Sequence, residues 1–191
     1  MDKIIRFIFM LILSISSTSL LPAIYLIKSS YKIIKWEGLG SEYSLQLNTA
    51  IYLLVVGILS KISLWMIKHR APDSINNDVK EISTVNNEYL PIYLGYIFVS
   101  LSIPTLADNQ IDWVSLMVIY LLICLFVTFS KSLCFNPVFI IFGYSYYQVR
   151  TSGNIKIFVI TKKVIRKNDN HVTFPHLTKI TETVYFDKER N

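Results

Sequence analysis

The residue types that most often carry chemistry are few and scattered in this chain. Its histidines and cysteines, His69, His171, His176, Cys124 and Cys134, lie at spacings that match no metal-binding motif. The sequence also contains no HExxH motif, no GxSxG motif and no glycine-rich phosphate loop. We therefore expect no catalytic residue, no cofactor and no metal site, and we expect that the protein is not an enzyme.

The densest group of charged side chains is a basic cluster formed by Lys162, Lys163, Arg166 and Lys167. Three interpretations of this cluster stay open. It is an exposed loop whose charge helps to fix topology, or a patch attracted to anionic lipids, where each nearby cation contributes about 1 kcal/mol. The third interpretation is a docking surface for an acidic partner or nucleic acid. No recognised nucleic-acid motif accompanies it, so direct binding of nucleic acid is not expected.

Four long apolar runs precede this cluster in the first two-thirds of the chain. They are Ile4–Ile27, Leu45–Ile67, Leu90–Ala107 and Ile111–Phe129. Each run has the roughly 18 to 25 residues that a helix needs to cross a hydrocarbon core of about 30 Å. The composition, 52% hydrophobic and 17% charged, also departs from that of a soluble domain. The sequence therefore predicts four transmembrane helices.

The distribution of positive charge predicts the topology. Lys3, Arg6, the loop after the second run and the tail carry most of the Lys and Arg residues. Because such residues stay on the cytoplasmic side, both termini are expected there. The first run could be a secretory signal, but its length favours a retained helix. We expect two domains, a transmembrane domain at residues 1–133 and a basic tail domain at residues 134–191.

Charged groups at membrane depth are almost absent from these runs. Lys61 is the only charged residue well inside one of them, and its side chain can reach the headgroup region. Transporters and channels need polar or ionisable groups to replace the hydration of their substrate. A small channel or transporter is therefore a disfavoured alternative.

The tail has a strand-like pattern. Asn136 and Pro137 end the fourth helical pattern, and residues 138–149 are rich in β-branched and aromatic side chains. A turn at residues 151–154 separates them from a second apolar segment at 155–161, and a third segment follows at 178–186. The predicted fold is a membrane all-α bundle of four transmembrane helices followed by a small cytoplasmic β-rich domain with about three antiparallel strands.

The segment from Phe135 to Val149, FNPVFIIFGYSYYQV, followed by Thr151-Ser152-Gly153 and an apolar strand, resembles the KwaA family, the membrane subunits of the Kiwa anti-phage defence system. The expected four spans and the size of the tail also resemble this family. The resemblance implies a multi-pass protein of the bacterial inner membrane that forms a homo-oligomer and detects a disturbance of the envelope. It also implies a cytoplasmic DNA-binding partner similar to KwaB.

The expected function is therefore that of a membrane-embedded sensor or scaffold that recruits or activates this partner. We expect Asn136, Pro137 and Gly143 to form a coupling junction between the helices and the tail, because repacking of the spans would move this segment. The basic cluster is the expected contact with the partner or with membrane lipids. The alternative function is that of a bacteriocin or colicin immunity protein, a small basic membrane protein that binds an invading toxin.

Overall fold

The structure is a computed structural model that describes residues 3–34, 40–70, 79–85, 90–105, 111–129, 135–151, 153–165, 174 and 176–188. The chain forms two compact units. The helix unit comprises residues 1–61 and 91–136, and the sheet unit comprises residues 62–90 and 137–191. Each unit thus takes residues from two separate stretches of chain, whereas the sequence suggested two continuous domains that meet at residue 134.

The first apolar run forms two helices rather than one, α1 (Lys3–Thr18) and α2 (Leu20–Lys28). Hydroxyl groups compete for the backbone carbonyls at the break, where Thr18 Oγ1 donates to the Ser14 carbonyl at 2.8 Å and Ser19 Oγ donates to the Ser16 carbonyl at 2.7 Å. Pro22 also lacks the N–H that would bond the Thr18 carbonyl. Such side-chain bonds bend helices, so the break follows from the local sequence.

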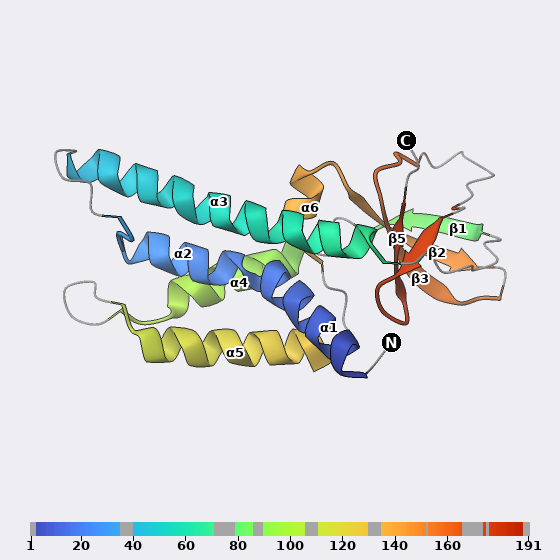
Figure 1. Ribbon diagram of the computed structural model, residues 1–191, viewed down its shortest axis with the longest axis horizontal. Coiled ribbons are helices and arrows are strands. Elements are labelled where there is room, and N and C mark those ends of the chain that lie inside the picture. Colours follow the sequence, from blue (N-terminus) through green and yellow to red (C-terminus); the bar gives the residue numbers. More distant parts are fainter. Residues whose placement is uncertain are drawn as a thin grey trace. The chain divides into compact units, whose positions relative to one another are not determined.

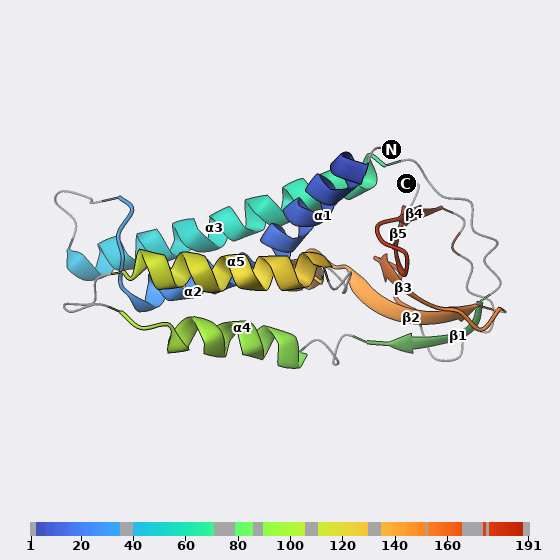
Figure 2. The ribbon, with the colours of Figure 1, turned by 90° about the horizontal axis from the view of Figure 1, so that it is seen from below.

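The remaining apolar runs form α3 (Ser41–Lys68), α4 (Leu90–Ser102) and α5 (Trp113–Phe129), shown in Figures 1 and 2. Residues 7–28 and helix α3 are long and apolar enough to cross a membrane. Helices α4 and α5 have 13 and 17 residues, which corresponds to about 20 Å and about 26 Å of rise. The expectation of four transmembrane helices is therefore not supported by the lengths of α4 and α5.

The helix unit is held together by a core between α2, α4 and α5. Leu21 and Tyr25 are fully buried against Ile103, Ile111 and Leu116. Helix α1 packs along α5. The five hydroxyl side chains at residues 14 and 16–19 are all buried, as expected for small residues that let membrane helices approach closely.

Hydrogen bonds fix one end of this unit. The Tyr25 hydroxyl donates to the Pro104 carbonyl and accepts from the Asp112 backbone N–H, both at 3.0 Å. Lys28 Nζ donates to the Leu101 and Ile103 carbonyls at the end of α4. These carbonyls lack partners within their own helix, so Lys28 acts as its C-terminal cap.

The described residues of the sheet unit form a mixed sheet of five strands in the order β1-β2-β3-β5-β4. The strands are β1 (Val79–Thr84), β2 (Ser145–Thr151), β3 (Lys156–Thr161), β4 (Leu177–Lys179) and β5 (Val184–Asp187). The predicted hairpin of β2 and β3 is confirmed, and Asn154 has the positive φ of 60° that its turn requires. The prediction of about three antiparallel strands was wrong, because β5 pairs in parallel with β3 and β1 comes from the loop after α3.

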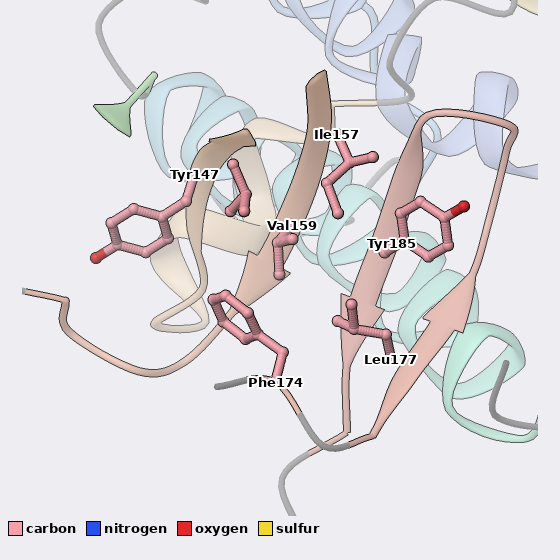
Figure 3. Close-up of a cluster of buried hydrophobic side chains, with 7 residues drawn as sticks. Tyr147, Ile157, Val159, Phe174, Leu177 and Tyr185 are labelled. Atoms are coloured by element: carbon pink, nitrogen blue, oxygen red, sulfur yellow. The ribbon is translucent and has the colours of Figure 1, made fainter. Parts of the chain in front are cut away.

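One face of this sheet carries its core (Figure 3). Tyr147, Val149, Ile157, Val159 and Tyr185 alternate along three strands and pack with Phe174 and Leu177. The other face carries Tyr146, Ile160 and Phe186, which are also buried. Strands β3 and β5 are buried on both faces over most of their length, which explains why these two strands read as almost continuous apolar runs.

Asp112 caps the N-terminus of α5, and this cap predicts a pH dependence. The Ser115 hydroxyl donates to Asp112 Oδ2 at 2.6 Å and the Ser115 backbone N–H donates to Oδ1 at 3.0 Å. These bonds lower the pKa of Asp112 below its ordinary value of 3.8. A carboxyl group whose pKa is lower in the folded state than in the unfolded state stabilises the fold at pH values above the unfolded-state pKa. This stability is lost as the pH falls through the pKa of the folded state.

We therefore expect the wild type to lose more thermal stability than Asp112→Asn when unfolding is followed in detergent between about pH 6 and about pH 2. Asparagine keeps the cap but does not titrate. Parallel stability profiles for the two proteins would contradict this role of Asp112.

Candidate functional site

The structure describes two of the four residues of the predicted basic cluster, Lys162 and Lys163. Lys162 is exposed directly after β3, and Lys163 is partly buried. Arg166 and Lys167 lie outside the described residues. The ammonium group of Lys162 lies 5.2 Å from the centroid of the Tyr144 ring, and that of Lys68, at the end of α3, lies 6.0 Å from the same centroid. The fold thus brings together cations that are far apart in the sequence.

Lys163 has a contact within the sheet unit. Its Nζ lies 3.6 Å from Oδ2 of Asp187, whose side chain is 1% exposed. Thr161 Oγ1 donates to the same oxygen at 2.8 Å. A buried carboxylate needs such partners, so Lys163 stabilises the adjacent ends of β3 and β5. This contact makes Lys163 a weaker candidate for binding a partner than Lys162.

Asn136, the first residue of the predicted coupling junction, is buried in the helix unit and is 2% exposed. Its side-chain Nδ2 donates to the Ser16 hydroxyl of α1 and to the Ser60 hydroxyl of α3, both at 2.8 Å. The Ser60 hydroxyl donates to the Val56 carbonyl, so its oxygen is available to accept from Asn136. One amide therefore joins two helices to the segment that follows α5.

Pro137 and Gly143, the other junction residues, bracket the short helix α6 (Pro137–Ile141) in the sheet unit. The prediction of a strand from residue 138 was wrong here, because proline is well suited to the first position of a helix. Gly143 has a φ of 81°, its N–H donates to the Ile140 carbonyl, and the Tyr144 N–H donates to the Phe139 carbonyl. This is a Schellman cap, which requires the left-handed conformation that glycine adopts most easily.

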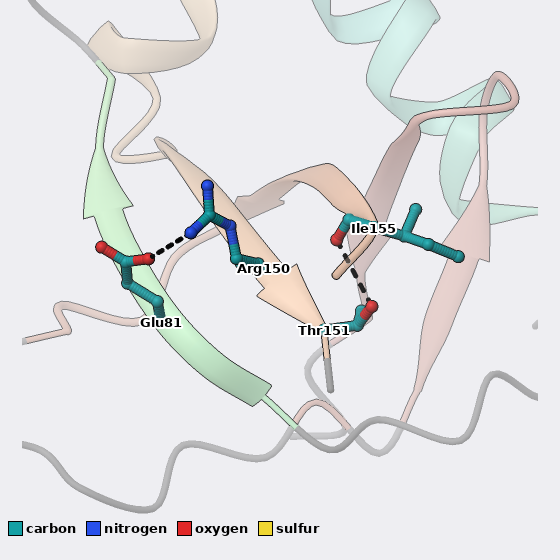
Figure 4. A network of polar contacts seen from close by, with 4 residues as sticks. All are labelled: Glu81, Arg150, Thr151 and Ile155. Carbon is teal, nitrogen blue, oxygen red and sulfur yellow. Dashed lines mark hydrogen bonds and ion pairs between the residues drawn. The ribbon is translucent and has the colours of Figure 1, made fainter. Parts of the chain in front are cut away.

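A polar hollow of about 110 Å³ lies on the sheet and is lined by Glu81, Ser83, Gln148, Arg150 and Lys156. The strand register places Glu81, Arg150 and Lys156 in one row across β1, β2 and β3. Arg150 Nη1 forms an ion pair with Glu81 at 3.3 Å (Figure 4). The hollow presents guanidinium, ammonium, hydroxyl and amide donors around one carboxylate, a set that suits a small anionic group.

The hollow was not predicted from the sequence, because strand β1 was not recognised there. A β-bulge between Val79 and Glu81 shifts the pairing register of β1 with β2. As a result Val79 and Ile82, three residues apart, both pack on the core face. The segment therefore lacks the strict alternation by which a strand is usually recognised. In the sequence, the spacing of Val79 and Ile82 was a signal that could have indicated this bulged strand.

Comparison with known proteins supplies the family. The family model described as anti-phage protein KwaA matches residues 9–186. The chain belongs to the KwaA family. The match runs through both units and includes Asn136, Gly143 and the five residues of the hollow. No curated protein and no solved structure matches the chain.

Membership of the KwaA family confirms the resemblance seen in the sequence and connects the chain with anti-phage defence in the Kiwa system. The geometry selects the candidates within this family member, which are the Asn136 network, the Gly143 cap, the polar hollow and the lysines at Tyr144.

The Schellman cap at Gly143 predicts opposite effects of alanine at two glycines. No atom lies within 4 Å of a Cβ built at Gly143 or at Gly95, which is inside α4. Gly143→Ala should cost about 1 kcal/mol, since a left-handed alanine is strained. Gly95→Ala should instead stabilise its helix by about 0.5 to 1 kcal/mol.

Thermal unfolding of the two variants in detergent measures this difference, and we expect the melting temperatures to move in opposite directions by about 2 to 4 °C. Gly143→Asn should lie closer to the wild type, because asparagine tolerates positive φ. A Gly143→Ala variant as stable as Gly95→Ala would show that the cap is not needed.

Proposed function

We propose that the chain is the membrane-embedded sensor and scaffold subunit of an anti-phage defence complex, and that it recruits or activates a cytoplasmic DNA-binding partner. Family membership supplies the connection with defence. The proposed role depends on assembly and docking rather than on catalysis.

Membrane insertion is supported by the large apolar surface of the helix unit. Helices α3, α4 and α5 expose large hydrophobic side chains along much of their length, among them Leu54, Phe98, Val114, Phe126 and Phe129, each at least 60% exposed. Soluble monomers rarely expose apolar patches larger than a few hundred Å². A hydrocarbon environment would remove this surface from water, and this observation carries the proposal.

The proposed topology is multi-pass in a bacterial inner membrane with both termini in the cytoplasm. The paired helices α1 and α2 would cross once and α3 would cross again. Helices α4 and α5 are short, so their crossings would need non-helical ends buried in protein, or a locally thin bilayer. The bonds from Lys28 and Tyr25 to carbonyls near the end of α4 provide such burial.

Partner docking is assigned to the polar hollow. The side chain of Lys156 is exposed and makes no hydrogen bond or ion pair with any described residue, while Arg150 has one ion pair, to Glu81. An acidic side chain of the partner would gain charge-assisted hydrogen bonds from both cations. Glu81 would disfavour a continuous polyanion such as nucleic acid. Several copies of the chain in a homo-oligomer would add avidity to a weak single contact.

Coupling between the membrane and this docking face is assigned to Asn136 and Pro137. A change in bilayer thickness or tension that separates α1 from α3 would break the bonds of Asn136 to Ser16 and Ser60. The next residue, Pro137, begins α6 and leads into β2 through the Gly143 cap. A movement of Asn136 would therefore reach the sheet through only a few residues.

Affinity purification from host membranes tests partner docking with a matched pair of charge reversals. Lys156→Glu places a negative charge in the hollow, whereas Lys179→Glu changes an exposed lysine on β4, outside it. With the full chain tagged after Asn191, we expect a soluble DNA-binding protein to co-purify with the wild type and with Lys179→Glu. Its recovery with Lys156→Glu should fall at least about tenfold, as for the loss of a charge-assisted contact worth about 1.4 kcal/mol or more.

Two outcomes would count against the proposal in different ways. Equal recovery of the partner with both variants would exclude the hollow as its docking site. Recovery of the wild-type protein alone, from membranes that contain it in quantity, would contradict partner recruitment itself.

A further inference from the structure

Exposed cations from two distant parts of the chain meet at Tyr144 in the sheet unit. Lys68 is the last residue of α3, and Lys162 directly follows β3. Their ammonium groups lie 6.0 Å and 5.2 Å from the centroid of the Tyr144 ring. Tyr144 itself is 4% exposed and packs against Phe186 at 5.4 Å between ring centroids. The buried ring is therefore a fixed platform beside which the fold places two exposed lysine side chains.

The two lysines are not neutralised within the described chain. Neither Lys68 nor Lys162 has an ion pair with a described carboxylate, and Asp187 is occupied by Lys163. A third ammonium lies near the same helix end, where Lys188 Nζ donates to the Arg70 carbonyl. Like charges held close together repel one another, and an anion between them would relieve this repulsion.

Exposed apolar side chains flank these cations. Trp65 precedes Lys68 by one helical turn and is 62% exposed, while Ile141 in α6 and Val164 after Lys162 are each 81% exposed. Trp65 also packs against His69, with ring centroids 4.4 Å apart and ring planes tilted by 43°. Tryptophan and lysine at the end of a long apolar helix mark the interface between a bilayer and water. Exposed aliphatic tips beside cations are typical of segments that rest on a membrane surface.

This combination favours a lipid over other anions. Single-stranded nucleic acid is bound through aromatic faces on which bases stack, and Tyr144 is buried. Duplex DNA is bound through many phosphate contacts, whereas this site gathers only a few cations. An acidic protein segment would gain little from three exposed apolar side chains around the charges. The headgroup of an anionic phospholipid instead offers a phosphate for the lysines and acyl chains for the apolar side chains.

We propose that Lys68 and Lys162, held over Tyr144, bind the phosphate of an anionic phospholipid in the leaflet at the C-terminal end of α3. This binding requires α3 to enter the membrane but is independent of the cytoplasmic partner. Each exposed lysine near such a lipid contributes about fivefold to binding, and the two together about 25-fold. The site would fix the sheet unit to the leaflet at one point.

Native mass spectrometry of the full chain in detergent, titrated with phosphatidylglycerol and separately with zwitterionic phosphatidylcholine, tests this proposal. We expect Lys68→Gln and Lys162→Gln each to weaken phosphatidylglycerol binding about fivefold and the double variant about 25-fold. Phosphatidylcholine binding should not change. Glutamine keeps most of the side-chain length and removes only the charge. Lys179→Gln is the matched control, since Lys179 is exposed and lies on β4.

A double variant with wild-type affinity for phosphatidylglycerol would overturn the proposal. So would a loss of affinity in Lys179→Gln equal to that in Lys68→Gln or Lys162→Gln, because the effect would then be one of overall charge. A double variant that binds lipid normally but loses its protein partner would assign the two lysines to protein docking and would also overturn it. Thermal unfolding in detergent checks that each variant is folded. A chain found in the soluble fraction would instead contradict membrane insertion.

Discussion

The arrangement of the helix unit depends on how one buried amide is satisfied. Asn136 follows a long apolar helix and lies almost entirely out of water, where an unbonded side-chain amide would cost several kcal/mol, roughly 2 to 7. Its partners are hydroxyls on α1 and α3, so both helices must present a serine at the same depth. This requirement fixes the rotation of two helices about their axes. It also places the start of α6, because Pro137 is the next residue.

The same serine-rich stretch has a second consequence. Hydroxyls that bond backbone carbonyls in α1 weaken the helix at Ser19, so one apolar run becomes two helices. The second of them, α2, carries Tyr25 and Lys28 to the carbonyls near the end of α4. Residues 7–28, which have the composition of one membrane span, therefore contact both Asn136 and the residues near the end of α4. The buried polar side chains of Ser16, Ser60 and Asn136 stabilise this unit only because they are bonded to one another.

Much of this could be predicted from the sequence, and the failures have physical causes. The apolar runs predicted the helical regions, and Gly153 and Asn154 predicted the turn of the β2–β3 hairpin. Both predictions succeeded because hydrophobic patterns and turn preferences are local properties of the sequence. The parallel pairing of β5 with β3 could not be predicted, since it depends on contacts between segments distant in the chain. Strand β1 was hidden by its bulge, and the hollow was hidden with it. Asn136 was predicted to belong to a coupling junction, but its partners on α1 and α3 could not be read from the sequence.

A double-mutant cycle between Asn136 and Ser60 tests the central claim most directly. The free energy of unfolding in detergent would be measured for the wild type, Asn136→Ala, Ser60→Ala and the double variant. If the amide joins the helices, the double variant should lose about 1 kcal/mol less than the two single losses combined, because the second substitution removes a bond already broken. Additive losses, within about 0.3 kcal/mol, would show that the two side chains do not interact and would contradict the role assigned to Asn136.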